Sequence, residues 1–137
     1  MYKSILLAAD GSDNSYRAAR EALKICSDNS TITILTVESI DESVDNVLHS
    51  VEGQGAGNKR KKRLQKITDL FDSNNVKYIV KIEKGEPKDK VVESANSGQY
   101  EIVVLGTRGL NGLQEMVLGS VSHKVAKRSE IPVLIVK

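Results

Sequence analysis

A pattern of glycine and serine residues in the last third of the chain has the composition of a phosphate-binding loop. It reads Gly106-Thr107-Arg108-Gly109, then nine residues, then Gly119-Ser120-Val121-Ser122. Glycine lets the main chain approach a ligand closely. The first amides of a helix lack intrahelical partners and can donate to an anion. The serine hydroxyls add further donors, so the pattern predicts a site for a di- or triphosphate.

The same residues also have a purely structural interpretation. Short glycine patterns occur in many ordinary turns, and Ser120 has the side chain of a helix cap. The pattern follows an apolar run and precedes an amphipathic stretch, and this strand-loop-helix context favours the phosphate site. Arg108 either clamps a phosphate or is a solvated loop charge, and the sequence leaves both interpretations open.

The elements that position this loop are read from the apolar runs. Four runs are continuous, as is typical of strands buried on both faces of a parallel sheet: Ile5–Ala9, Ile32–Val37, Ile102–Leu105 and Ile131–Val136. A fifth run, Val76–Ile82, alternates with lysines, which predicts a strand with one wetter face at a sheet edge.

Helical spacing of apolar residues lies between these runs. The first stripe runs from Ser15 to Cys26, the second from Leu64 to Phe71, and the last from Met116 to Val125. Pro87 stands where a further helix would begin. Alternation of strands and helices predicts one α/β domain with a parallel sheet and helices on both faces. The polar stretch Ser39–Asn58 is expected to be a surface loop, mobile at least in its later half.

Composition excludes several classes of function. Lys and Arg number 20 against 18 Asp and Glu, a net charge of +2 over 137 residues, so a nucleic-acid partner is not expected. A single cysteine, Cys26, excludes an internal disulfide and fits a reducing compartment. The first apolar run is too short for a signal peptide or a membrane span, so a cytoplasmic protein with no membrane partner is expected. The dinucleotide and P-loop fingerprints are also missing.

Three segments together resemble a known family, the ATP-binding universal stress proteins. They are the motif Gly106-x2-Gly109-x9-Gly119-Ser120, the opening Ile5-Leu6-Leu7-Ala8-Ala9-Asp10-Gly11-Ser12 and the closing Ile131-Pro132-Val133-Leu134-Ile135-Val136. The resemblance covers the chain from end to end and is weakest between Val44 and Arg63. It implies a doubly wound, five-stranded parallel sheet of order 3-2-1-4-5, with the order reversing between the first and fourth strands.

The resemblance also implies a ligand and its contacts. ATP would lie at the carboxyl edge of the sheet, with its ribose between Asp10 and Gly106 and its base over the second strand. Mg²⁺ or Mn²⁺ bridging the phosphates is compatible with this arrangement. Asp10 and Ser12 have an alternative role as caps of the first helix. The implied contact residues are Ala9, Asp10, Val37, Gly106, Arg108, Gly109, Gly119, Ser120, Val121 and Ser122.

The expected function is that of an ATP-binding regulatory protein of the stress response, with no rapid turnover. Phosphoryl transfer needs a positioned nucleophile and charge-stabilising groups, and the sequence places no candidate base near Ser120. Dimerisation through the last strand, Val133–Val136, is implied by the resemblance and fits an apolar sheet edge. Two alternatives stay open: a dimeric interaction module of the same fold that binds no nucleotide, and a slow ATPase.

Overall fold

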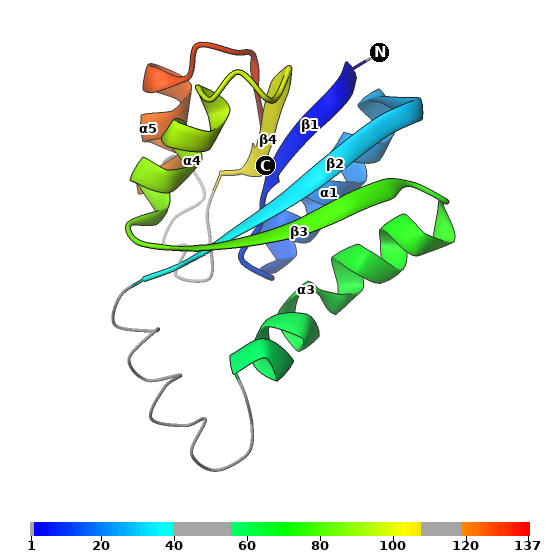
Figure 1. Cartoon of the computed structure of the whole chain (residues 1–137). Helices are drawn as coiled ribbons and strands as arrows, with labels where there is room; N and C mark the ends of the chain where they lie inside the picture. Colours follow the sequence, from blue (N-terminus) through cyan, green and yellow to red (C-terminus); the bar gives the residue numbers. More distant parts are fainter. Residues whose placement is uncertain (1, 40–55, 108–118) are drawn as a thin grey trace.

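A computed structural model describes residues 2–39, 56–107 and 119–137, and these form five strands and four helices (Figure 1). The elements in chain order are β1 (Tyr2–Ala8), α1 (Asp13–Ile25), β2 (Cys26–Glu38), α3 (Ala56–Ser73), β3 (Lys77–Lys84), α4 (Pro87–Ala95), β4 (Ile102–Gly106), α5 (Ser120–Arg128) and β5 (Val133–Val136).

The strands form one sheet in the order β3-β2-β1-β4-β5, and every neighbouring pair is parallel. This confirms the predicted fold class and strand order. β1 lies in the middle, between β2 and β4, so the chain winds outward in opposite directions on the two sides of β1. A crevice outside the carboxyl ends of the strands is expected at such a reversal, and β1 and β4 flank it.

Alternate residues of the central strands pack into two separate cores, which explains why their apolar runs are continuous. On one face, Ile5 and Leu7 of β1 pack with residues of α1 and α3 around the fully buried Phe71. On the other face, Leu6 packs with residues of α4 and α5, including the fully buried Val125. Helices therefore cover both faces, as the alternation of elements predicted.

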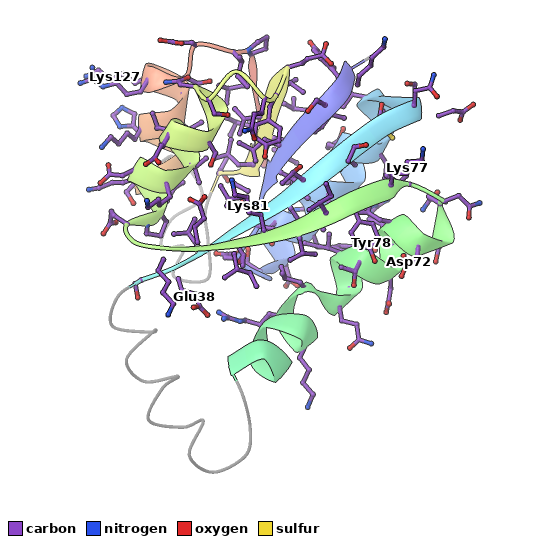
Figure 2. All side chains as sticks on the ribbon, in the orientation of Figure 1. Glu38, Asp72, Lys77, Tyr78, Lys81 and Lys127 are labelled. Carbon is purple, nitrogen blue, oxygen red and sulfur yellow. The ribbon has the colours of Figure 1, made fainter. Side chains whose placement is uncertain are left out.

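β3 is an edge strand, as the alternating pattern predicted. Tyr78 on β3 contacts Phe71 of α3 with the ring centroids 5.8 Å apart, and its hydroxyl donates to Asp72 Oδ1 at 2.9 Å. Figure 2 shows Tyr78 and Asp72 side by side, where the end of α3 meets the start of β3. The start of the strand is thus fastened to the helix that precedes it.

Three expectations about element boundaries were wrong. Cys26 is not on the first helix, because its backbone is extended and it begins β2 as a half-buried residue. β2 therefore starts six residues before Ile32, and its first residues are mostly polar. α3 begins at Ala56, so residues 56–58 are helical although a loop was expected there; good helix formers directly follow Gly57 and Asn58.

Pro87 occupies the first turn of α4, as predicted, where its missing amide hydrogen costs no hydrogen bond. The expected helical residues Met116 and Val117 and most of the expected loop lie outside the described residues. No helix in the described part of the chain is both long and apolar enough to cross a membrane.

Candidate functional site

Thr107 joins the two ends of the predicted phosphate loop. Its carbonyl oxygen accepts from the Gly119 amide at 2.6 Å and from the Ser122 hydroxyl at 2.9 Å. Its amide donates to the carbonyl oxygen of Val136 on β5 at 3.0 Å. The end of β4 and the start of α5 are therefore held together and fixed to the sheet edge.

The first turn of α5 has no side-chain cap. Gly119 is the N-cap residue and has no side chain with which to accept a bond, and the first intrahelical bond runs from the His123 amide to the Gly119 carbonyl at 2.9 Å. The amides of Ser120, Val121 and Ser122 precede that bond, so helix geometry gives them no carbonyl partner within α5. These are three of the residues for which the sequence predicted phosphate contacts.

The side chains of this turn differ in their surroundings. Ser120 is exposed, and Val121 is half-buried against the core formed with α4. Ser122 is only 1% exposed, and its hydroxyl lies 2.9 Å from the Thr107 carbonyl oxygen and 3.1 Å from that of Gly119. The structure therefore gives Ser122 a positioning role through its side chain and leaves its amide among those without a carbonyl partner within α5.

Asp10 follows β1 and forms part of the turn into α1. Its Oδ1 accepts from the Ser12 amide at 3.0 Å, and the Ser12 hydroxyl in turn accepts from the Ser15 amide at 3.1 Å. Ser12 is thus the N-cap of α1, and the structural role considered from sequence is present. Asp10 is half-buried and lies at the carboxyl end of β1, next in the sheet to the strand that ends at Gly106.

Gly106 packs closely against the first turn of α1. A Cβ atom at this position would lie 1.9 Å from Asn14 Oδ1, which is closer than real contacts allow. Asn14 belongs to the first turn of α1 and is buried. The absence of a side chain at Gly106 therefore lets the first turn of α1 lie directly against the end of β4, and the Asp10 turn leads into that same helix.

Two further predicted residues lie at the same edge of the sheet. Ala9 is buried, and its amide donates to the carbonyl oxygen of Leu35 on β2 at 3.0 Å. Val37 is half-buried and is the second-last residue of β2. Ala9 follows β1, which flanks the reversal, and Val37 lies near the end of β2, the neighbour of β1 in the sheet. Arg108 and Gly109 lie outside the described residues.

Sequence reasoning missed two residues that shape this site, Thr107 and Asn14. Thr107 was part of the motif, but nothing in its type indicated that its backbone would anchor both loop ends. Asn14 stands in the first turn of α1. The only feature of the sequence that could have indicated its role is Gly106, a glycine at the end of a strand that packs against that turn. Within residues 2–39, 56–107 and 119–137, no group of three metal-ligating side chains is present.

Comparison with known proteins gives a consistent result. The model of the universal stress protein family matches residues 1–137. The universal stress protein MJ0531 of Methanocaldococcus jannaschii is 32% identical over 149 residues, covering 100% of this chain and 83% of that protein. This chain is also similar to Methanocaldococcus jannaschii protein MJ0577, solved to assign a biochemical function, with a TM-score of 0.82, 27% identity and coverage of 100% and 96%.

A second solved structure is a universal stress protein in complex with cAMP. It has a TM-score of 0.73 and 30% identity, and the match covers 99% of this chain and 97% of that one. The shared fold, the full-length family match and the relative above 30% identity agree with one another. The chain therefore belongs to the universal stress protein family.

Proposed function

We propose that this protein binds ATP at the carboxyl edge of its sheet and acts as a regulatory module whose loop order or dimer surface depends on the nucleotide. The observation that carries the proposal is the uncapped first turn of α5 beside the strand-order reversal. A related universal stress protein has been solved with cAMP, which supports an adenine nucleotide as the ligand class.

The phosphates would be held by the start of α5. Three amides and the Ser120 hydroxyl supply donors, and the positive end of the helix dipole favours an anion. Each exposed contribution of this kind is about 0.3–1 kcal/mol, so several acting on one polyphosphate are needed for useful affinity. Arg108 and Gly109 complete the proposed phosphate contacts.

The nucleoside would lie toward β1 and β2. Asp10 is proposed to accept from the ribose hydroxyls, and the main chain of Ala9 and Val37 to border the base. The side chains that border this edge fit a sugar better than a second phosphate, because a carboxylate repels an anion. Any divalent ion would be bound mainly by the phosphates themselves. Mg²⁺ is rarely held by protein groups alone and commonly takes substrate phosphate oxygens beside one or two carboxylates.

The test uses two variants at the start of α5. Ser120→Asp places a negative charge at the first helical position, where it stabilises the helix by about 0.3–1 kcal/mol while repelling phosphate. Gly119→Val blocks the approach of a ligand at a backbone φ of −66°, which any residue adopts. Isothermal titration should show ATP affinity reduced tenfold or more in both variants. Unchanged affinity in both would contradict the proposal.

Dimerisation through β5 is a separate part of the proposal. β5 forms the sheet edge opposite β3, and all four of its residues are apolar and half-buried. Antiparallel pairing of Val133–Val136 with a second copy would cover this short edge and place two nucleotide sites on one continuous sheet. A charge introduced by Val133→Glu should shift sedimentation toward monomer, and an unchanged sedimentation coefficient would contradict this part.

A further inference from the structure

The opposite edge strand, β3, exposes large hydrophobic side chains. In the described part of the chain, the exposed large hydrophobic residues are Ile79, Val80 and Ile82, with exposed fractions of 57%, 41% and 40%. All three lie on β3, an eight-residue strand at the sheet edge. The unpaired backbone groups of an edge strand are a template for pairing with another chain, and the exposed apolar side chains of β3 add to the character of an interaction surface.

The outward backbone groups of β3 follow from its pairing with β2. The Gly85 amide donates to the carbonyl oxygen of Glu38 at 2.8 Å, so the backbone of Gly85 faces β2. Backbone groups of successive residues alternate between the two sides of a strand. The amides and carbonyls of Tyr78, Val80 and Ile82 therefore face away from β2 and are directed at the outer edge.

We infer that β3 pairs antiparallel with β3 of a second copy of this chain, about a two-fold axis that passes Val80. A two-fold pairing of this kind places each residue opposite one on the same face of the extended sheet. Val80 then faces the partner's Val80, and Tyr78 faces the partner's Ile82. On the other face, Lys77 is opposite the partner's Glu83, and Ile79 is opposite the partner's Lys81.

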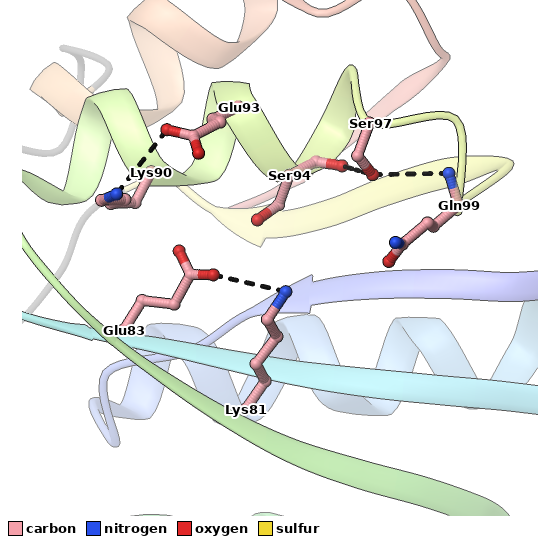
Figure 3. Close-up of polar contacts among 7 residues, drawn as sticks. All are labelled: Lys81, Glu83, Lys90, Glu93, Ser94, Ser97 and Gln99. Atoms are coloured by element: carbon pink, nitrogen blue, oxygen red, sulfur yellow. Dashed lines mark hydrogen bonds and ion pairs between the residues drawn. The ribbon is translucent and has the colours of Figure 1, made fainter.

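This register is complementary on both faces. On the α3 face, Tyr78, Val80 and Ile82 form a continuous apolar row with their counterparts, and aromatic–β-branched pairs favour strand pairing. On the α4 face, two Lys77–Glu83 pairs form between the copies. Glu83 already forms an ion pair with Lys81 of its own strand, with 3.3 Å between Lys81 Nζ and Glu83 Oε1 (Figure 3). In the paired strands, Glu83 would therefore lie between two lysines. The stem of Lys81 would cover the exposed Ile79 of the partner.

The neighbouring registers oppose like charges. A two-fold axis at Ile79 places Lys77 opposite the partner's Lys81, and an axis at Lys81 places that lysine opposite itself. Like charges directly opposite one another destabilise a strand pair. Figure 2 shows Lys77 and Lys81 spaced along β3, and this spacing disfavours the registers about Ile79 and Lys81, whereas the register about Val80 forms two Lys77–Glu83 pairs and opposes no like charges. Because the strand is complementary to itself, the occupant of the edge is a second copy of the chain.

Charge exchange provides the first test, by sedimentation velocity across a concentration series without nucleotide. Lys77→Glu and Glu83→Lys each convert two opposite-charge pairs into like-charge pairs, so each should raise the dissociation constant of this interface tenfold or more. An equimolar mixture of the two variants restores both pairs and should recover wild-type assembly. Lys84→Glu is the matched control for Lys77→Glu. It makes the same charge change on β3, at a position that does not face the partner's Glu83.

The expected pattern is a larger species for wild type, Lys84→Glu and the mixture than for either single variant. A mixture that stays as small as its components, or a wild type no larger than the single variants, would overturn the proposal. Pairing at β5 cannot produce the recovery on mixing, because it involves neither residue. Failure of ATP binding would likewise leave this result unaffected.

A disulfide provides the second test in a Cys26→Ser background. Opposed Cα atoms in a hydrogen-bonded antiparallel pair are about 5.5 Å apart, which a disulfide spans. Val80→Cys should therefore crosslink with the partner's copy under mild oxidation. Ile82→Cys is a control of equal exposure, because its two copies would be separated by four residues, about 14 Å. Crosslinking of Ile82→Cys in preference to Val80→Cys would contradict the register.

Discussion

The hydroxyl of Ser122 lies 2.9 Å from the carbonyl oxygen of Thr107, and the same oxygen accepts from the Gly119 amide at 2.6 Å. One carbonyl at the end of β4 thereby fixes the first turn of α5. The buried Ser122 side chain therefore helps to fix the turn that carries the proposed donors.

Ser122→Ala and Ser120→Ala should separate anchoring from binding. Ser122 is buried, so loss of its hydroxyl should lower the free energy of unfolding by about 1 kcal/mol, measured by urea denaturation. Ser120 is exposed, so its truncation should leave stability within about 0.5 kcal/mol while weakening ATP binding. Equal stability of both variants would contradict the anchoring role of Ser122.

Gly106→Ala should destabilise the protein because its Cβ would overlap Asn14 Oδ1. Overpacking of this kind costs about 1–3 kcal/mol, measured by thermal or urea denaturation. The double variant Gly106→Ala/Asn14→Ala removes the overlapping atoms and should be more stable than the sum of the two single changes predicts. Simple additivity would show that the overlap does not cause the loss.

The Tyr78–Asp72 contact predicts a stability change in alkali. The Tyr78 phenol donates to the Asp72 carboxylate, and this bond, with smaller contributions from burial and from Asp72 and Asp69, raises the pKa of Tyr78 above its ordinary value of 10.0. Because the pKa of Tyr78 is raised in the folded protein, the contribution of this bond to the free energy of unfolding is fully present below about pH 10. It is lost as the pH rises through the folded pKa.

Tyr78→Phe should remove this dependence. Its cost at neutral pH should fall at the low end of about 0.5–1.5 kcal/mol, because the pair is exposed to solvent. Asp72→Asn is the matched control, since it keeps an acceptor and removes the charge. Urea denaturation between pH 8 and 11 measures the effect. A wild-type profile that parallels Tyr78→Phe throughout would contradict it.

Cys26 should be a slow thiol in the folded protein. Burial raises its pKa, with a smaller contribution from Asp28, although a backbone hydrogen bond opposes the shift. The thiolate is the reactive form, so alkylation by iodoacetamide near pH 8 should be slower in the native protein than in urea. Asp28→Asn should lower the pKa and accelerate native alkylation. A rate unaffected by either change would contradict this account of Cys26.

Apolar periodicity predicted the parallel α/β class of the fold because the central strands are buried on both faces, whereas the strand order was implied by the family resemblance. Ile5, Leu6 and Leu7 alternate between two cores, and this produces a continuous run that is easily recognised. The polar beginning of β2 carries no such signal, because Ser27–Asn29 are exposed. Its pairing with β1 is also interrupted by a register shift between Tyr2 and Ser4.

The candidate site could be predicted only in outline. The Gly-Ser motif and Asp10 marked the region, because glycine and helix amides have a known affinity for anions. Their individual roles depend on tertiary contacts that residue type does not encode. Ser122 and Ser120 are chemically identical in sequence, yet one hydroxyl is buried against Thr107 and the other side chain is exposed. Gly106 was assigned to ligand approach, whereas the structure packs it closely against the Asn14 side chain.

The most direct test of ATP binding uses the purified protein without added ligand. One portion of the protein is denatured and the released small molecules are identified by mass spectrometry. A second, folded portion is emptied of nucleotide and titrated with ATP beside Ser120→Asp. The account predicts an adenine nucleotide in the released fraction, ATP binding by the emptied wild type, and loss of binding in a Ser120→Asp variant at least as stable as wild type. No released nucleotide together with no heat of ATP binding by the wild type would contradict it.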